Sequence, residues 1–143
     1  MGVGGIITAV AGEIHQKSSD VGKSGEDLAC EYLEREGYLI IGRNEKNKLG
    51  EIDIIARDVD DTLVFVEVKA MRCSGVGDSG DSKDSLQPED NVTRSKMGKV
   101  RRACELLLAT EHFPVKERAG WRIDVVALTF AMNNVTIRHY KNV

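Results

Sequence analysis

Residues 63 to 69, Leu-Val-Phe-Val-Glu-Val-Lys, form the stretch that decides the fold. The stretch is rich in β-branched and aromatic residues and lacks glycine and proline, which favours a mostly buried strand over a helix. Because strand side chains alternate, the three valines share one face, whereas Phe65, Glu67 and Lys69 share the other. A Glu-x-Lys pair alone is commonly a weak ion pair at a solvated strand end, so the meaning of this pair depends on its neighbours.

The composition is that of one globular domain. The chain has 143 residues, of which 41% are hydrophobic and 30% charged, enough to bury a core. Cys30, Cys73 and Cys104 lack the spacing of a zinc site or a disulfide scaffold and fit a reducing, cytoplasmic location. We interpret the three scattered histidines as surface residues. The apolar opening stretch is shorter than the roughly 20 residues of a membrane helix, so we expect residues 1–20 to be a flexible or weakly docked arm and no membrane partner.

The net charge of −3 comes from one segment. Between Cys73 and Asn91 there are five acidic residues and one lysine. This segment is rich in glycine and serine and has almost no large apolar side chain, so we expect residues 74–90 to form a mobile acidic loop. Outside it the charges nearly balance, and basic residues cluster at positions 43–48 and 94–102.

Hydrophobic periodicity predicts two helices and five strands. The first helix opens near Ser24, like a capping box, and is closed by Gly37. The second covers residues 92–109, and strands are expected at 38–43, 51–56, 62–69, 122–130 and 135–140. Residues 21–143 therefore form a single α/β domain with a central sheet covered by helices.

A hairpin between the second and third predicted strands brings two acidic residues together. With residues 59–61 as a three-residue loop, paired residue numbers sum to 120 and Asp53 faces Glu67. Like charges opposed across strands are destabilising unless something offsets them, and a divalent cation such as Mg²⁺ or Mn²⁺ suits oxygen ligands from two strands. Lys69 follows on the same face, about 6.6 Å along the strand. A loop longer by one residue would turn Asp53 to the other face.

Five segments carry a resemblance. They are Gly25-Glu26, Gly-Glu-Ile-Asp-Ile-Ile at 50–55, Phe-Val-Glu-Val-Lys at 65–69, Asn-Val-Thr-Arg-Ser-Lys at 91–96 and Trp-Arg-Ile-Asp-Val-Val at 121–126. This set resembles the YraN-like family of bacterial proteins, which is similar to archaeal Holliday-junction resolvases and to PD-(D/E)xK nucleases. The resemblance extends from about Gly25 to Leu128. It implies a restriction-endonuclease-like mixed sheet flanked by helices. Ile52 stands at the name-giving proline position, and the acidic loop is long and lies beside the expected DNA path.

This resemblance implies a metal-dependent endonuclease that hydrolyses DNA, with branched or structured DNA as a candidate substrate. The implied catalytic residues are Glu26, Asp53, Glu67 and Lys69. Asp53, Glu67 and the carbonyl of Val68 would hold Mg²⁺ or Mn²⁺. Lys69 would orient or deprotonate the attacking water, or neutralise developing charge. Glu26 would act through a water or a second ion, the alternative being an interaction with the helix dipole alone.

Six basic residues are candidates for phosphate contacts: Arg43, Lys48, Arg72, Lys96, Lys99 and Arg102. A solvated helix face is the alternative for the cluster at 94–102, as is simple snorkelling for Lys96, and Glu51 is interpreted as structural. Resolvases work as dimers, so a homodimer is one expectation. Two other functions stay open, a non-catalytic nucleic-acid-binding module and an interaction scaffold that keeps the nuclease fold.

Overall fold

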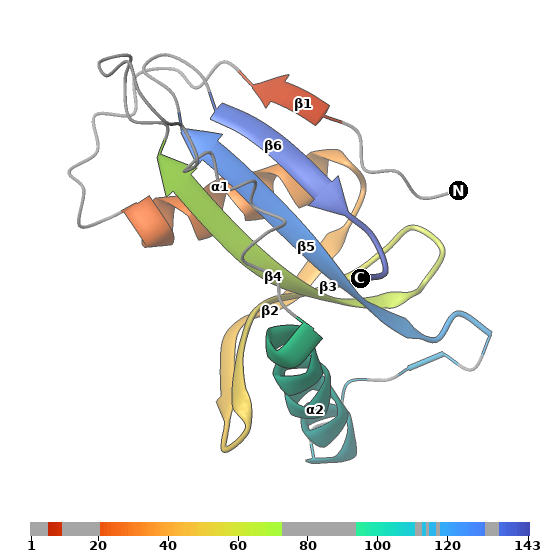
Figure 1. The fold of residues 1–143 in the computed structure, drawn as a ribbon. Coiled ribbons are helices and arrows are strands. Elements are labelled where there is room, and N and C mark those ends of the chain that lie inside the picture. The colour runs from red at the N-terminus through yellow and green to blue at the C-terminus, as the bar shows by residue number, and fades with distance from the viewer. Residues whose placement is uncertain are drawn as a thin grey trace.

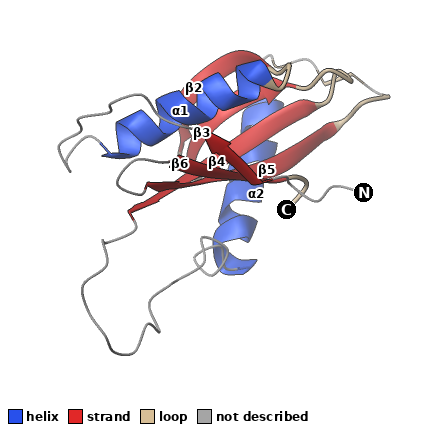
Figure 2. Ribbon diagram, turned by 90° about the horizontal axis from the view of Figure 1, so that it is seen from above, coloured by secondary structure: helices blue, strands red, loops and turns tan. Residues whose placement is uncertain are grey.

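The computed structural model describes residues 6–9, 21–72, 94–110, 113, 115–116, 118–130 and 135–143. These residues form a mixed α/β domain, a six-stranded sheet with a helix on each face, which confirms the predicted fold class (Figures 1 and 2). The elements are β1 (Ile6–Ala9), α1 (Val21–Arg35), β2 (Leu39–Asn47), β3 (Gly50–Arg57), β4 (Leu63–Arg72), α2 (Arg94–Thr110), β5 (Trp121–Phe130) and β6 (Val135–Tyr140). The predicted acidic loop at 74–90 lies outside the described residues.

The strands follow the order β1-β6-β5-β4-β3-β2. β4 and β5 run parallel, and every other neighbouring pair is antiparallel. Strand β1 was not predicted, because its residues belong to the segment expected to be a flexible arm. In the structure they pair with β6 from Ile6↔Arg138 to Ala9↔Val135. Within the described residues, no helix combines the length and apolar composition of a membrane span.

The alternation within β4 separates two apolar cores. Val64 and Val66 pack with residues of α1, whereas Leu63 and Phe65 pack with residues of α2. A strand buried on both faces reads as a nearly continuous apolar run, which is what residues 63–66 show. Glu67 and Lys69 have the parity of Phe65 and therefore lie on the face that α2 covers.

The predicted hairpin register is confirmed. β3 and β4 pair from Arg57↔Leu63 to Ile54↔Val66, and each pair of numbers sums to 120. The amide of Asp58 donates to the carbonyl of Thr62 at 2.9 Å, which closes a three-residue loop. β2, in contrast, extends beyond its predicted end at Arg43 to Asn47, so most of the stretch predicted as a polar turn is strand.

Two glycines fix α1. Gly37 has φ 94° and ends the helix in a Schellman motif, in which Tyr38 N–H donates to Leu33 C=O at 2.9 Å. At Gly25, a Cβ would lie 3.0 Å from Cβ of Ala70 in β4. The absence of that carbon lets the helix approach the strand closely. The helix starts three residues before the predicted Ser24.

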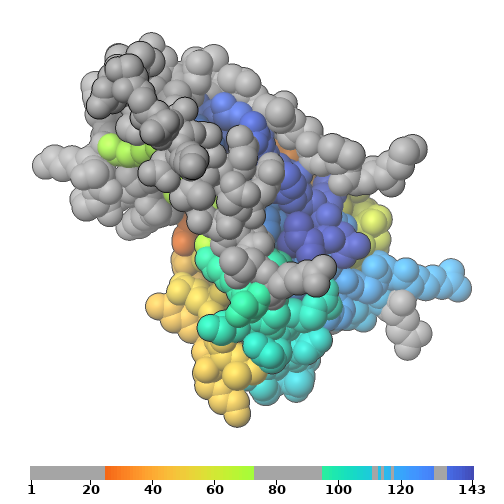
Figure 3. All heavy atoms as spheres, in the orientation of Figure 1, coloured from red at the N-terminus to blue at the C-terminus, as the bar shows by residue number. Residues whose placement is uncertain are grey.

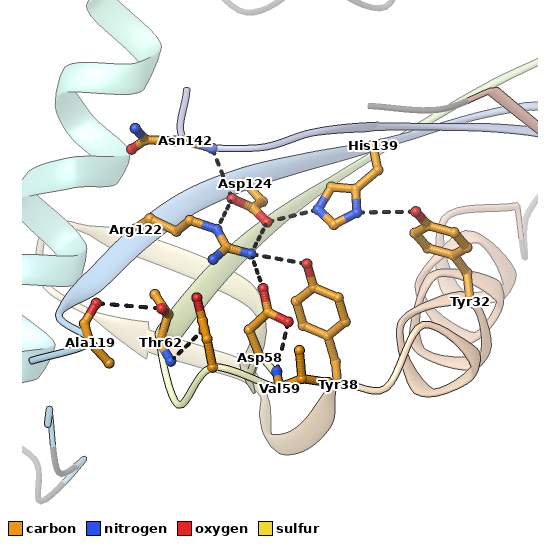
Figure 4. A network of polar contacts seen from close by, with 11 residues as sticks. Tyr32, Tyr38, Asp58, Val59, Thr62, Ala119, Arg122, Asp124, His139 and Asn142 are labelled. Carbon is orange, nitrogen blue, oxygen red and sulfur yellow. Dashed lines mark hydrogen bonds and ion pairs between the residues drawn. The ribbon is translucent and has the colours of Figure 1, made fainter. Parts of the chain in front are cut away.

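A buried polar network joins the strands at the end of the sheet where β4 and β5 begin (Figure 4). Asp124 is fully buried and accepts hydrogen bonds from Arg122 at 2.9 Å and from His139 at 2.7 Å. These bonds and the amide of Asn142 outweigh burial and hold the pKa of Asp124 below its ordinary value. Because the carboxylate can only accept, Nε2 of His139 carries a proton, and Nδ1 is hydrogen-bonded to the hydroxyl of Tyr32 at 3.2 Å.

His139 corrects the sequence interpretation. It was taken as a surface residue, but only 1% of it is exposed, because its position on β6 faces the sheet's interior. The other two histidines lie outside the described residues. The predicted internal ion pair between Arg122 and Asp124 is present, and Arg122 also contacts Asp58 at 2.7 Å. These groups satisfy one another in the core.

The glycine at position 25 yields a stability prediction. Gly25→Val should lower the free energy of unfolding by about 1–3 kcal/mol, because the new side chain must push α1 away from Ala70. In the matched variant Gly98→Ala, a Cβ meets nothing within 4 Å, so helix propensity should raise stability by about 0.5–1 kcal/mol. Urea denaturation followed by circular dichroism measures both, and equal losses in the two variants would contradict the close-approach argument.

Candidate active site

The candidate site forms where β3 and β4 separate. Their last paired residues are Ile54 and Val66. Beyond this pair, the amide of Val68 donates a 2.8 Å hydrogen bond to Oδ2 of Asp53 instead of to a backbone carbonyl of β3. The carboxyl group of Asp53 thus takes the place of a backbone carbonyl as the acceptor for this amide. This bond holds the carboxyl group over β4, on the same face as Glu67.

Asp53 and Glu67 are brought together as the register predicted. Their carboxyl groups lie close enough to interact across the end of the strand pair. Burial raises the pKa of Asp53 to about 7, and the charges of Glu67 and Glu26 add to the rise, although the Val68 amide opposes it. A carboxyl group that ionises only near neutrality, beside a second one, marks a position where a cation would be stabilised.

Two lysines surround the same carboxyl group. Nζ of Lys69 lies 3.3 Å from Oε1 of Glu67, and Nζ of Lys96 lies 3.8 Å from the same oxygen. Only 13% of the Glu67 side chain and 21% of the Lys69 side chain are exposed. Contact with Lys69, followed by burial, lowers the pKa of Lys96. Burial opposes the charge on Lys69, but its contacts with Lys96 and Glu67 outweigh burial and raise its pKa.

Glu26 approaches the site from α1. Its charge contributes to the raised pKa of Asp53, so the first-helix acid predicted from the sequence lies within electrostatic reach of the strand pair. Arg43 of β2 lies 3.9 Å from Glu26 and 2.8 Å from Asp27. The predicted phosphate-binding residue Arg43 is therefore engaged by two carboxylates of α1. The close approach at Gly25 brings this end of the helix to β4.

The predicted basic residues divide into two groups. Lys96 belongs to the carboxylate cluster, and Lys99 lines a pocket together with Glu67. Arg102 lies about 120° around α2 from Lys96, away from the pocket. Lys48 is exposed in the turn between β2 and β3, and Arg72 is exposed at the end of β4. The structure thus gathers the first two at the site and leaves the last three on the surrounding surface.

Sequence reasoning missed one supporting residue, Asn47, and the exact place of another, Lys96. Asn47 donates a 2.9 Å hydrogen bond to the carbonyl of Ala103, and its own oxygen accepts from the amides of Leu49 and Gly50. These bonds fasten the tip of the β2–β3 hairpin to α2. Placing Lys96 beside Glu67 was also missed, although its position in the apolar stripe of α2 indicated a side chain directed at the sheet.

The donor atoms suit a hard cation that retains water. Among the described residues, no three His, Cys, Asp or Glu side chains group closely enough to hold a metal by themselves. The site offers the carboxyl groups of Asp53 and Glu67, and the resemblance adds the backbone carbonyl of Val68 as an expected third donor. Mg²⁺ commonly takes one or two carboxylates and keeps several waters, so these donors fit Mg²⁺ or Mn²⁺. The two lysines compete with a cation for Glu67.

Comparisons with known proteins place this site within a broad bacterial family. Residues 25–128 match the sequence model of UPF0102, an uncharacterised protein family. A UPF0102 protein of Geobacter metallireducens is 37% identical over 129 residues, covering 90% of this chain and 93% of that protein. One from Syntrophomonas wolfei is 38% identical over 125 residues, covering 86% and 96%. The matched region contains all four predicted catalytic residues.

A solved structure is more distantly similar. Pyrococcus furiosus SfsA in complex with Ca²⁺ aligns with a TM-score of 0.33 and 16% identity, over 87% of this chain and 64% of that one. At this distance the likeness says nothing about the activity of the present chain.

The raised pKa of Asp53 predicts an unusual dependence of stability on pH. Between the ordinary value of 3.8 and about 7, the folded protein keeps a proton that the unfolded chain has released. The stability that this proton provides is present at low pH and is lost as pH rises through about 7. Asp53→Asn should remove this loss and give a higher Tm than wild type at about pH 8.

Thermal melts followed by circular dichroism across pH, without divalent cations, measure this effect. Glu31→Gln changes an exposed carboxyl group on α1 and should follow the wild-type profile. An Asp53→Asn variant with the wild-type fall in Tm between acid and neutral pH would contradict the assignment to Asp53.

Proposed function

This chain belongs to the uncharacterised protein family UPF0102, and from the acid and lysine cluster on β3 and β4 we propose that it is a metal-dependent nuclease hydrolysing DNA phosphodiester bonds. The observation that carries the proposal is the placing of two acids and a lysine together: the Val68 amide holds Asp53 over β4 at 2.8 Å, on the face of Glu67, and Nζ of Lys69 lies 3.3 Å from Glu67. Fold stability does not require acids to meet in this way, because like charges opposed across strands are destabilising. A divalent cation would compensate both carboxyl groups at once, in addition to the two lysines beside Glu67.

Each residue has a role in the proposed reaction. Asp53, Glu67 and the Val68 carbonyl would hold Mg²⁺ or Mn²⁺, which supplies a more acidic water and stabilisation of charge on the phosphate. Lys69 would stand beside the attacking water or donate to a phosphate oxygen. Glu26 would hold an outer water of the site from α1. The hydrogen bond from Val68 N–H fixes Asp53 before substrate arrives, which reduces the ordering needed on binding.

The finer features of the proposal rest on the sequence resemblance. The ordered segments with Glu26, Asp53, Glu67 and Lys69 are similar to those of Holliday-junction resolvases and PD-(D/E)xK nucleases. DNA is accordingly the proposed partner, branched or structured DNA the candidate substrate, and a homodimer fits the same resemblance. The proposed cytoplasmic location rests on the cysteine pattern. Lys99 at the pocket and Arg72, Lys48 and Arg102 on the surrounding surface would supply phosphate contacts.

One observation favours a second function. Nζ of Lys69 and Nζ of Lys96 both lie within 3.8 Å of Oε1 of Glu67, so the negative charge of that carboxyl group is already compensated without a metal. If this compensation excludes divalent cations, the protein is a DNA-binding module without catalysis. Calorimetric titration with Mn²⁺ separates the two functions. A nuclease should bind Mn²⁺, and Asp53→Asn should weaken that binding, whereas a DNA-binding module without catalysis does not require Mn²⁺ binding.

The nuclease proposal predicts a specific pattern of lost activity. Asp53→Asn and Glu67→Gln should abolish Mg²⁺-dependent cleavage, because each removes a charged oxygen ligand while changing little volume. Lys69→Ala should lower the cleavage rate roughly 10²–10³-fold, as expected for losing a positioned charge at the reacting phosphate. Gel-based cleavage of four-way junctions, flaps, duplexes and single strands measures these rates.

Glu31→Gln provides the matched control, since this exposed acid on α1 lies outside the cluster, and it should cleave like wild type. All variants should retain DNA binding in anisotropy measurements. Cleavage by Asp53→Asn at the wild-type rate would rule out the proposed centre.

The phosphate contacts predict a change in salt dependence. Replacing Lys99 and Arg102 with Ala should weaken binding to all DNA sequences alike. Each lost contact should also flatten the plot of log affinity against log salt by about one unit. Arg35→Ala, at the far end of α1, is the matched control and should leave the slope unchanged. Fluorescence anisotropy over a salt series gives the slopes, and identical slopes for wild type and the double variant would place the phosphates elsewhere.

A further inference from the structure

A pocket of about 210 Å³ lies between α2 and the tip of the β2–β3 hairpin, next to the acid and lysine cluster. Figure 3 shows the two elements side by side, the hairpin in yellow and α2 in green. The hairpin contributes Leu49, Gly50 and Glu51, and α2 contributes a face that includes Lys96, Lys99 and Val100. Glu67 completes the wall from β4. A ligand in this pocket would therefore lie beside the proposed reacting phosphate.

Small residues and one side-chain hydrogen bond build this pocket. A Cβ added to Gly50 would lie 3.5 Å from Cβ of Ala103, so the hairpin and helix touch there. Asn47 donates to the carbonyl of Ala103 at 2.9 Å and fixes the same contact. The pocket is thus bounded by two elements that are joined to each other, rather than by a loose loop.

The lining has two kinds of surface. Leu49 and Val100 offer apolar side chains, and Leu49 is 45% exposed in an otherwise polar turn. Lys96 and Lys99 offer positive charge on the helix side. A free inorganic anion would leave the apolar surface unused, and an apolar molecule would leave the lysines unused. A nucleotide matches both, because its base has apolar faces and its phosphate carries negative charge.

Charge and size decide which part of a nucleotide enters. Glu51 and Glu67 would repel a phosphate inside the pocket, whereas a base edge can donate hydrogen bonds to carboxylates. The volume is below the roughly 300–1,000 Å³ of pockets that take drug-sized ligands, so it suits a single base and not a stacked pair. The phosphate would remain at the rim with Lys96 and Lys99.

We infer that this pocket receives one unpaired base of a DNA strand, next to the proposed cleavage site at Asp53 and Glu67. The inference rests on the proposed function and narrows its substrate class. A base within a duplex must be unstacked and unpaired before it can enter such a pocket, at a cost that is smallest for bases already unpaired. The preferred DNA therefore has unpaired nucleotides at the cleavage position, as flaps and single strands do.

Truncation of Leu49 tests the inference without touching the proposed catalytic residues. Three fluorescein-labelled DNAs of shared sequence are used: a single strand, a duplex with a single-stranded flap and a fully paired duplex. Binding is measured by anisotropy in EDTA, where metal-dependent cleavage cannot interfere. Leu49→Ala should weaken binding to the single strand and the flap roughly tenfold, the lower end of the effect of lost apolar contact in a pocket, and leave duplex binding unchanged.

Leu39→Ala is the matched control. Leu39 is also an exposed leucine, 63% exposed, but it lies at the start of β2, far from the hairpin turn that holds Leu49, and outside the pocket. It should bind all three DNAs like wild type. An oligonucleotide with 2-aminopurine at the unpaired position adds a direct readout, because its fluorescence should change on binding to wild type and not to Leu49→Ala.

The results separate this inference from the nuclease proposal. Equal losses on all three DNAs, or no loss on any, would overturn the pocket assignment even if wild type cleaves DNA in Mg²⁺. A loss confined to unpaired DNA would support the pocket even if no cleavage occurs in Mg²⁺, in which case only the catalytic proposal fails.

Discussion

The hydrogen bond from the Val68 amide to Asp53 is the interaction on which the site depends. Beyond Ile54 and Val66 the backbone ladder between β3 and β4 ends, and an unsatisfied amide in a partly buried strand would be costly. The carboxylate satisfies that amide at 2.8 Å. The same bond allows the β2–β3 hairpin to diverge from β4 while one of its acids stays beside Glu67. The site thus forms because the backbone pairing between β3 and β4 ends at this point.

The two helices complete the site from opposite faces of the sheet. α1 approaches closely because position 25 has no Cβ, and it delivers Glu26. α2 covers the face with Phe65 and delivers Lys96 to Glu67 at 3.8 Å. Charge of both signs is concentrated here, while the buried network around Asp124 uses its charges entirely within the core. The acids at the candidate site could still be neutralised by a bound cation, whereas the Asp124 network is a structural cluster whose hydrogen bonds are complete.

The hairpin has a second consequence. Because Asn47 fastens its tip to α2, the space between hairpin and helix is held open beside the acids. An exposed leucine and two lysines border the same space. The pocket would then bind the substrate, and the adjoining acids and lysines would carry out the chemistry. A substrate held in the pocket would be positioned at the acids.

The sequence alone determined the fold class, the strand parity and the hairpin register, because these follow from local alternation and loop length. It therefore predicted that Asp53 would face Glu67 with Lys69 alongside. It did not predict strand β1, because these four residues pair with β6, which lies far away in the sequence. It also misjudged His139, whose burial depends on Asp124 and Tyr32 from distant parts of the chain.

Only the tertiary structure decided which basic residues from other elements meet the acids. A basic residue on a helix or in a turn carries no local signal of its distance from a given acid, because that distance is set by how elements pack. Packing assigned Lys96 to Glu67 and Arg43 to Asp27 and Glu26, and it left Arg102 off the pocket face. The pocket likewise exists only because the tip of the β2–β3 hairpin is fastened to α2, which is distant in sequence. The fastening bond, from the Asn47 side chain to the Ala103 carbonyl, leaves no periodic pattern in the sequence.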